Sequence, residues 1–211
     1  MEARFVQPAS TRRPHKSRRF DVHGLKVSRA VTLFNKSPFH TWLDLESTPA
    51  VTWYCERPFV IDEGHQPRVV DFYVIRDERE QLWFCPTRVE VENNEPLLDR
   101  CPGFAHWCEH HNIEVVFVDM AGPVDNVART NWGHIIRELS AFRRYVSADL
   151  VSAIRSELSE PKTIADLWRM FPMVDPIVIK VGVFQLVHQG LATGSELGYL
   201  PISPAMTFSA P

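Results

Sequence analysis

The chain has 211 residues, of which 45% are hydrophobic and 23% charged, the composition of an ordinary globular protein. This length is sufficient for one domain with a sizeable core and a smaller second domain. No apolar run approaches the length that spans a bilayer, and no hydrophobic signal core follows the basic N-terminus, so the sequence argues against membrane contact. We therefore expect a cytoplasmic protein.

The net charge of −3 is unevenly distributed along the chain. Residues 1–30 contain eight Lys or Arg against two acidic residues, a net charge of +6, and the remainder carries −9. A cationic segment beside an acidic body favours contact with a polyanion, because each Lys or Arg that neutralises a phosphate releases counterions. We predict a basic, flexible arm over residues 1–24 that binds DNA through Arg12, Arg13, Lys16, Arg18 and Arg19. A disordered solubilising tail is the alternative.

The segment after the arm alternates between short strands and one helix. Residues 26–34 have the pattern of a short strand, and Ser37 with Pro38 predicts the start of a helix of about ten residues, with Ser37 as its N-cap. Residues 51–54 and 59–61 are typical of two further strands.

The next segment, residues 69–91, contains the clearest candidate for a functional carboxylate. Alternation places Asp71 and Tyr73 on one face of a strand and Val70 and Phe72 on the other, and both faces are mostly apolar. Asp71 is therefore predicted to be buried, in a hairpin that turns at residues 76–81 and returns at residues 82–85. Many nucleases hold a divalent metal with such a carboxylate. An Asp paired with an Arg in a structural network is an equally good interpretation.

Further along, residues 102–111 predict a helix that leads into an apolar strand at residues 113–118. A helix and strand after an antiparallel hairpin indicate an α/β fold with a mixed sheet and flanking helices. Residues 131–145 form an amphipathic helical pattern. We place a boundary after residue 146, which gives a domain over residues 25–146 and a second over residues 147–211.

The second domain has the element order of a winged helix, which is a variant of the helix-turn-helix. Three helices are expected at residues 148–158, 164–171 and 176–189, with Thr163 capping the second and Gly190 ending the third, and a ribbon at residues 199–208. The third helix offers few polar side chains, and residues 148–211 hold four Lys or Arg against six Asp or Glu. This surface favours contact with a protein over reading of DNA bases.

Cysteine and histidine side chains crowd into residues 101–111, which raises the question of a zinc site. Cys101 and Cys108 share one helical face and His106 and His110 share another, whereas tetrahedral zinc needs four converging ligands. Buried thiols with surface histidines are the favoured interpretation, and nothing marks a reactive thiolate. The four cysteines of the chain lack C-x-x-C spacing and fit reduced thiols.

Several short motifs follow one another from about residue 27 to the C-terminus. They are Arg29-x-Val31, Glu46 in the first helix, Pro49-x-Val51, Arg57-Pro58-Phe59, Val70-Asp71-Phe72, Asn112-Ile113-Glu114-Val115, the helix at Asn131 and the winged helix. Their order and spacing resemble the TnsA endonuclease subunit of heteromeric transposases. The resemblance implies a restriction-endonuclease-like fold that cuts the 5′ side of transposon ends with two metal ions. It also implies two partners, a DDE transposase and an AAA+ ATPase regulator.

Matched residue by residue, the resemblance implies that most of the catalytic pattern is missing. The family's helix glutamate falls on Pro38, its metal-binding aspartate on Asp71, and its Glu/Gln-x-Lys on Cys85-Pro86-Thr87. One aspartate holds Mg²⁺ weakly, because its other ligands are then nearly all water. A shift in register would bring Glu90 or Glu92, with Arg88, into the site.

Three hypotheses follow. The favoured one is a catalytically impaired TnsA-like transposition protein that binds DNA ends and a partner transposase or ATPase, because the losses fall at every position except Asp71. The second is an active Mg²⁺-dependent DNA endonuclease with a rewired site, in which Asp71 and Glu90 or Glu92 are the catalytic ligands. The third is a general DNA-binding accessory protein without a transposase partner.

Overall fold

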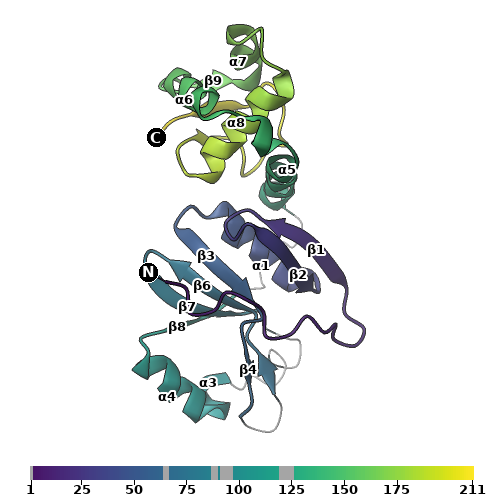
Figure 1. The fold of residues 1–211 in the computed structure, drawn as a ribbon, viewed down its shortest axis with the longest axis vertical. Helices are drawn as coiled ribbons and strands as arrows, with labels where there is room; N and C mark the ends of the chain where they lie inside the picture. Colours follow the sequence, from purple (N-terminus) through teal and green to yellow (C-terminus); the bar gives the residue numbers. More distant parts are fainter. Residues whose placement is uncertain (1, 64–66, 87–89, 91–96, 119–125) are drawn as a thin grey trace. The chain divides into compact units, whose positions relative to one another are not determined.

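The computed structural model describes residues 2–63, 67–86, 90, 97–118 and 126–211. The chain divides into two compact units, which are labelled in Figure 1 by their helices and strands. Unit 1 comprises residues 1–45 and 50–124, and unit 2 comprises residues 46–49 and 125–211. Within the described ranges, no helix combines the length and the apolar character that crossing a bilayer requires.

Unit 1 is built around a four-stranded mixed sheet in the order β3-β6-β7-β8, which confirms the predicted α/β class. Its first three strands pair antiparallel, and β8 pairs parallel to β7. The described elements of the unit are β1 (Arg19–Gly24), β2 (Arg29–Phe34), α1 (Lys36–Ser47), β3 (Val51–Glu56), β4 (Val60–Ile61), β5 (Arg68–Val69), β6 (Phe72–Arg76), β7 (Arg79–Phe84), α3 (Leu97–Arg100), α4 (Pro102–His110) and β8 (Glu114–Phe117).

The predicted hairpin is present as β6 and β7, but its turn is shorter than the polar run suggests. Arg76 pairs with Arg79, so only Asp77 and Glu78 form the turn, with φ angles of 48° and 61°. Residues 79–81 belong to β7, because their backbone groups continue the ladder to β6. Helix α1 begins at Lys36, one residue before the predicted cap Ser37.

Both faces of the central sheet are buried, as the apolar alternation predicts. Phe72 and Val74 on one face are fully buried, and on the same face the Trp42 side chain of α1 donates to the Tyr54 hydroxyl at 2.7 Å. The opposite face packs against α3 and α4 through a cluster that includes Tyr73, Leu82, Phe84, Phe104 and Cys108.

The prediction of a flexible arm over residues 1–24 is wrong at residues 19–24, which form a strand. Arg19–Gly24 form β1, which pairs with β2 along its whole length. Ahead of it, the Phe5 ring lies 5.1 Å from that of Phe59, and the Trp53 indole donates to the Phe5 carbonyl. Arg4 forms a salt bridge with Glu80 at 3.0 Å. The arm is held because its few apolar residues find buried partners on the sheet.

The domain boundary lies near residue 125 rather than residue 146. Helix α5 (Val127–Phe142) belongs to unit 2, because its buried Asn131 binds backbone groups there. The Asn131 amide donates to the carbonyls of Leu197 and Leu200 at 2.9 and 2.7 Å, and its oxygen accepts from the Ile202 N–H at 3.1 Å.

The helices of unit 2 agree with the sequence pattern, and its strands differ from it. The capping box of Thr163 and Asp166 is present at the start of α7. The predicted ribbon over residues 199–208 is wrong, since β10 and β11 flank a looped segment that contains Pro201 and Pro204, residues without a backbone donor. The elements that follow α5 are η1 (Arg143–Tyr145), α6 (Ala148–Glu157), β9 (Lys162–Thr163), α7 (Ile164–Met170), α8 (Pro176–His188), β10 (Thr193–Gly194) and β11 (Thr207–Ser209), with an antiparallel sheet order β10-β11-β9.

Candidate functional site

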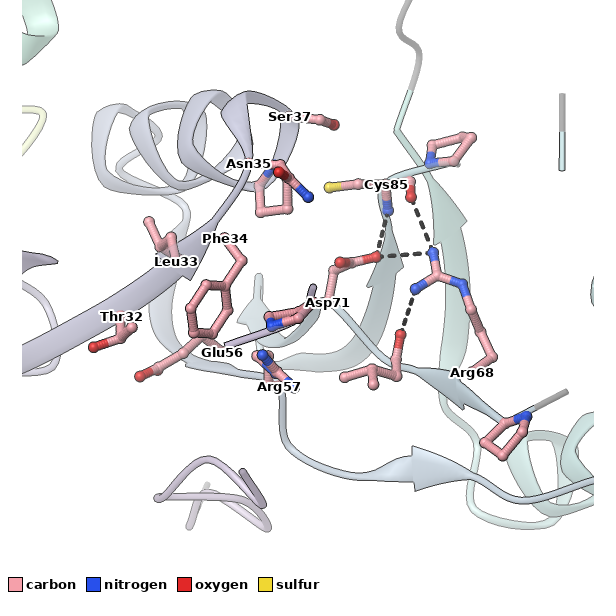
Figure 2. A pocket seen from close by; sticks show the side chains of 15 residues that line it. Thr32, Leu33, Phe34, Asn35, Ser37, Glu56, Arg57, Arg68, Asp71 and Cys85 are labelled. Carbon is pink, nitrogen blue, oxygen red and sulfur yellow. Dashed lines mark hydrogen bonds and ion pairs between the residues drawn. The ribbon is translucent and has the colours of Figure 1, made fainter. Parts of the chain in front are cut away.

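A cavity of about 480 Å³ opens in unit 1 beside the start of β6 and the end of β7. Figure 2 shows Asp71 near its centre, with Cys85 on one side and Arg57 below. Pro38 from α1 lines the same cavity. The structure therefore brings together the three described positions that the TnsA resemblance matches to catalytic groups.

Strand pairing explains why Asp71 and Cys85 are neighbours. Phe72 pairs with Trp83 across the antiparallel β6–β7 ladder, so the residue before β6 lies beside the residue after β7. The Cys85 N–H donates to Asp71 Oδ2 at 2.8 Å, and the Asp71 carbonyl accepts from the Arg57 N–H at 2.9 Å. Asp71 is thus fixed through both its side chain and its backbone.

The guanidinium of Arg68 contacts Asp71 from the other side. Its Nη2 atom lies 3.1 Å from Asp71 Oδ2 and donates to the Cys85 carbonyl at 2.9 Å. Its Nη1 atom donates to the Val69 carbonyl at 2.6 Å, and its Nε atom donates to Glu90 Oε1 at 2.8 Å. One guanidinium therefore bridges the two carboxylates that the rewired-site hypothesis names.

The neutral form of the Asp71 carboxyl group is favoured more in this environment than it would be on the exposed surface. Burial is the main influence and raises the pKa of Asp71, whereas the Arg68 charge and the Cys85 N–H act in the opposite direction. Burial also raises the pKa of the Cys85 thiol to about 12. Since Cys85 Sγ lies 3.3 Å from the Thr41 hydroxyl, Cys85 is a neutral, hydrogen-bonded thiol.

These side chains do not fit the metal ions that the resemblance implies. Mg²⁺ prefers oxygen ligands, and Pro38 supplies no side-chain oxygen while Cys85 supplies a thiol. One oxygen of each carboxylate, Asp71 Oδ2 and Glu90 Oε1, is already bound to Arg68. Within the described part of the chain, no three His, Cys, Asp or Glu side chains are grouped so that they could hold a metal ion. Thr87, Arg88 and Glu92 lie outside the described residues.

Arg57 and Glu56 also line the cavity, and Glu56 is paired with a further arginine, Arg29. Arg29 binds Glu56 through two hydrogen bonds of 2.7 and 2.5 Å, and Glu56 is almost fully buried. Arg57 lies 4.9 Å from the Phe34 ring, and Nη1 donates to the Arg12 carbonyl at 3.1 Å. Its Nε atom is buried without a hydrogen-bond partner among the described residues, and burial lowers the pKa of Arg57. The Arg57 charge is therefore desolvated and faces an open cavity.

The predicted DNA-binding residues lie on the segment that runs past this cavity. Pro14 lines it, and the Arg18 N–H donates to the side chain of Asn35, another lining residue, at 3.2 Å. The side chain of Arg19 pairs with Asp21. All five predicted residues are exposed: Arg12, Arg13, Lys16, Arg18 and Arg19.

The cysteine and histidine segment has the arrangement that its helical spacing predicts. Cys101 and Cys108 are buried, and Cys108 packs in the core under α4. His106 and His110 are exposed. Burial raises the pKa of Cys108 to about 11, which makes it an unreactive thiol.

Sequence reasoning named Asp71 and Glu90 but missed the arginines around them. Arg57 belonged to a recognised motif without an assigned role, and Arg68 was assigned no role. The available signal for Arg68 was the presence of a cation three residues before a carboxylate predicted to be buried, because such a carboxylate needs a partner.

Comparisons with known proteins give no family assignment. No protein-family model matches the chain, and no curated protein matches it either. The class of the protein therefore has to be inferred from the order of its elements and from the residues around the cavity.

Proposed function

We propose that the protein is a TnsA-like DNA transposition protein whose nuclease-like domain binds DNA as a catalytically impaired scaffold. The observation that carries this proposal is the convergence of Pro38, Asp71 and Cys85 on one cavity, with the Arg68 guanidinium bound to the remaining carboxylate. The positions that the resemblance matches to a nuclease site thus lie together, and the groups that would hold Mg²⁺ there are replaced or paired with Arg68.

The element order of unit 1 supports a restriction-endonuclease-like framework. Helix α1 precedes the antiparallel strands β3, β6 and β7, and α4 then connects to the parallel strand β8. Asp71 at the start of the second core strand and Cys85 at the end of the third are where the resemblance expects the aspartate and the Glu/Gln-x-Lys group.

The charges around the cavity support contact with a DNA backbone. Arg68 and Arg29 are each paired with carboxylates, whereas Arg57 forms no salt bridge within the described residues. Residues 12–19 add exposed cations on the segment that runs past the cavity, which Pro14 lines. Such groups bind phosphates regardless of base sequence, as expected of a scaffold on DNA.

Unit 2 supports the second half of the proposal, in which a winged-helix-like domain docks a DDE transposase or an AAA+ ATPase. The order α6-β9-α7-α8-β10-β11 and the sheet order β10-β11-β9 fit a winged helix. Helix α8, in the reading position, is largely buried, and its Lys180 is paired with Glu138 at 2.8 Å. Met170, Met173 and Ile177 are exposed near the turn that precedes α8, which favours a protein partner.

One observation favours an active, rewired endonuclease as a second candidate. Glu90 and Asp71 both bind Arg68, so a second acidic group and a basic group do converge on Asp71. For this site to cut DNA with Mg²⁺, Arg68 would have to leave the two carboxylates. The experiment below therefore includes Mg²⁺ as a variable.

We expect the full chain to bind duplex DNA in EDTA, to bind it in Mg²⁺ apart from the weakening that Mg²⁺ causes as a counterion of DNA, and to cut it in neither. Replacing Arg12, Lys16 and Arg18 together by glutamine should weaken binding and reduce the slope of log K against log salt by about 0.9 for each lost phosphate contact. These side chains are exposed, so folding should be unchanged. Fluorescence anisotropy over a range of salt concentrations measures both quantities.

Replacing Arg144, Arg155 and Arg169 together by glutamine is the matched control. These arginines are exposed, and the substitutions remove the same amount of charge from unit 2. If the salt slope of the variant at Arg12, Lys16 and Arg18 is unchanged, these residues do not contact DNA phosphates and the proposal is wrong for this segment. Mg²⁺-dependent nicking of transposon-end DNA that is lost in Asp71→Ala, alone or with a partner transposase, would support the endonuclease instead.

A further inference from the structure

We propose that the cavity of unit 1 binds a nucleoside monophosphate, with the phosphate on Arg57 and Asn35 and the base against the apolar walls. The inference does not rest on the proposed function, because it concerns a site for one nucleotide and does not require binding of duplex DNA. The nucleotide is either free or the phosphorylated end of a single strand, and the probes named below distinguish these two sources.

The charge of Arg57 is not compensated by a salt bridge within the described residues. Other arginines near the cavity are balanced by carboxylates: Arg29 pairs with Glu56, and Arg68 and Arg100 pair with Asp71 and Glu90. Asp71 attracts the Arg57 charge, but desolvation has the larger influence and lowers the pKa of Arg57. A desolvated charge is costly unless a counter-ion compensates it. The cavity beside Arg57 is therefore suited to an anion.

Arg57 and Asn35 also have donors that the protein does not use. Arg57 Nη1 donates to the Arg12 carbonyl, whereas Nε has no hydrogen-bond partner among the described residues. Asn35 accepts from the Arg18 N–H through Oδ1, so its Nδ2 atom remains as a donor. Figure 2 shows Asn35 and Arg57 to the left of Asp71, on the side away from Arg68. Phosphate oxygens accept hydrogen bonds from such donors.

The backbone of Arg57 is held in a left-handed conformation, with a φ of 48°. Its N–H donates to the Asp71 carbonyl and its carbonyl accepts from the Ala9 N–H, both at 2.9 Å. A glycine adopts this conformation without steric cost, whereas a residue with a side chain is strained there. Stability of the fold alone thus does not account for an arginine at this position, and such strain is common where a protein binds a ligand.

The size and lining of the cavity indicate a ligand larger than phosphate. Its volume of about 480 Å³ is within the range of small-molecule sites, roughly 300–1,000 Å³. Apolar side chains form much of its wall, including those of Leu33, Phe34, Val69, Pro14, Pro38 and Pro86. A flat base fits such a wall while its phosphate binds the cation. Bases in a duplex are stacked inside the helix, so the cavity selects a free nucleotide or an unpaired end.

Isothermal titration calorimetry of the full chain with each of the four deoxynucleoside 5′-monophosphates tests the inference. We expect at least one of them to bind about tenfold more tightly than its nucleoside, because the phosphate adds charge-assisted hydrogen bonds. Arg57→Gln should abolish this difference, and Arg57→Lys should retain part of it. Arg79→Gln removes an exposed arginine from β7 and is the matched control, which should bind as the wild type does.

A single-stranded oligonucleotide that begins with the best-bound base identifies the source of the nucleotide. If the ligand is a strand end, the oligonucleotide with a 5′-phosphate should bind more tightly than both the monophosphate and the 5′-hydroxyl form. If the ligand is a free nucleotide, the oligonucleotide should bind no more tightly than the monophosphate. Both results support the site.

Two results would overturn the inference. One is that no monophosphate binds more tightly than its nucleoside, and the other is that a folded Arg57 variant binds as the wild type does. Arg57→Gly relieves the strain at a φ of 48° and serves if Arg57→Gln unfolds, and circular dichroism establishes which variants are folded. Duplex binding by the variant at residues 12–18 tests the proposed function separately, so the two can fail independently.

Discussion

Replacing Asp71 by alanine is expected to lower the free energy of unfolding by about 3 kcal/mol. The Arg68 guanidinium stays largely buried but loses one of the two carboxylates that compensate its charge. The Asp71 and Arg68 side chains are only 15% and 16% exposed, so solvent screens their attraction little. The Cys85 N–H also loses its acceptor. Urea denaturation followed by tryptophan fluorescence measures the change.

The matched control is Asp77→Asn in the exposed β6–β7 turn, which removes a carboxylate that is 70% exposed and 3.7 Å from Arg76 and keeps a residue that tolerates the φ of 48°. It should change stability by no more than about 0.5 kcal/mol. Replacing Asp71 by leucine together with Arg68 by methionine should recover most of the loss, since both charges then leave together. If Asp71→Ala is as stable as the wild type, Asp71 does not have the structural role described above.

Replacing Asn131 by alanine should also cost about 3 kcal/mol, because three backbone groups lose at once the buried amide that binds them. These groups are the carbonyls of Leu197 and Leu200 and the N–H of Ile202. Asn131 is 1% exposed, so water cannot easily replace the amide. The expected result is a lower thermal midpoint for the unfolding of unit 2, measured by circular dichroism.

The neighbouring residue provides a control on the same helix. Thr130→Ala removes an exposed hydroxyl and should change stability by no more than about 0.5 kcal/mol. A loss of equal size in both variants would mean that the contacts of Asn131 with residues 197–202 do not determine the effect, since alanine raises the helix propensity at both positions.

The parts of the fold that could be predicted are those whose signals are local. Alternating apolar residues around Phe72 indicated a strand buried on both faces, and the Thr163 and Asp166 pair indicated the start of α7. The burial of Asp71 could be predicted for the same reason, because this carboxylate lies within an apolar alternating pattern.

The parts that could not be predicted depend on contacts between distant residues. The local signal at Arg19–Gly24 is only a short alternation, in which Phe20 and Val22 are apolar and Asp21 and His23 are polar. Its strand β1 is stabilised by pairing with β2. Helix α5 has an ordinary amphipathic pattern, and contacts with distant residues assign it to unit 2, such as those of Asn131 about 70 positions on and the Glu138–Lys180 pair. Likewise, the Glu90 interaction with Arg68 spans 22 positions.

The fixed path of the N-terminal segment affects the thermodynamics of any association with a polyanion. A disordered cationic tail loses conformational entropy when it is captured, whereas the backbone of Arg12 and Arg18 is already bonded to Arg57 and Asn35. Only side-chain rotamers then remain to be ordered, at a cost of about 0.5–1.5 kcal/mol for each immobilised side chain. The heat-capacity change on binding should accordingly be small, as for a preorganised surface rather than for coupled folding.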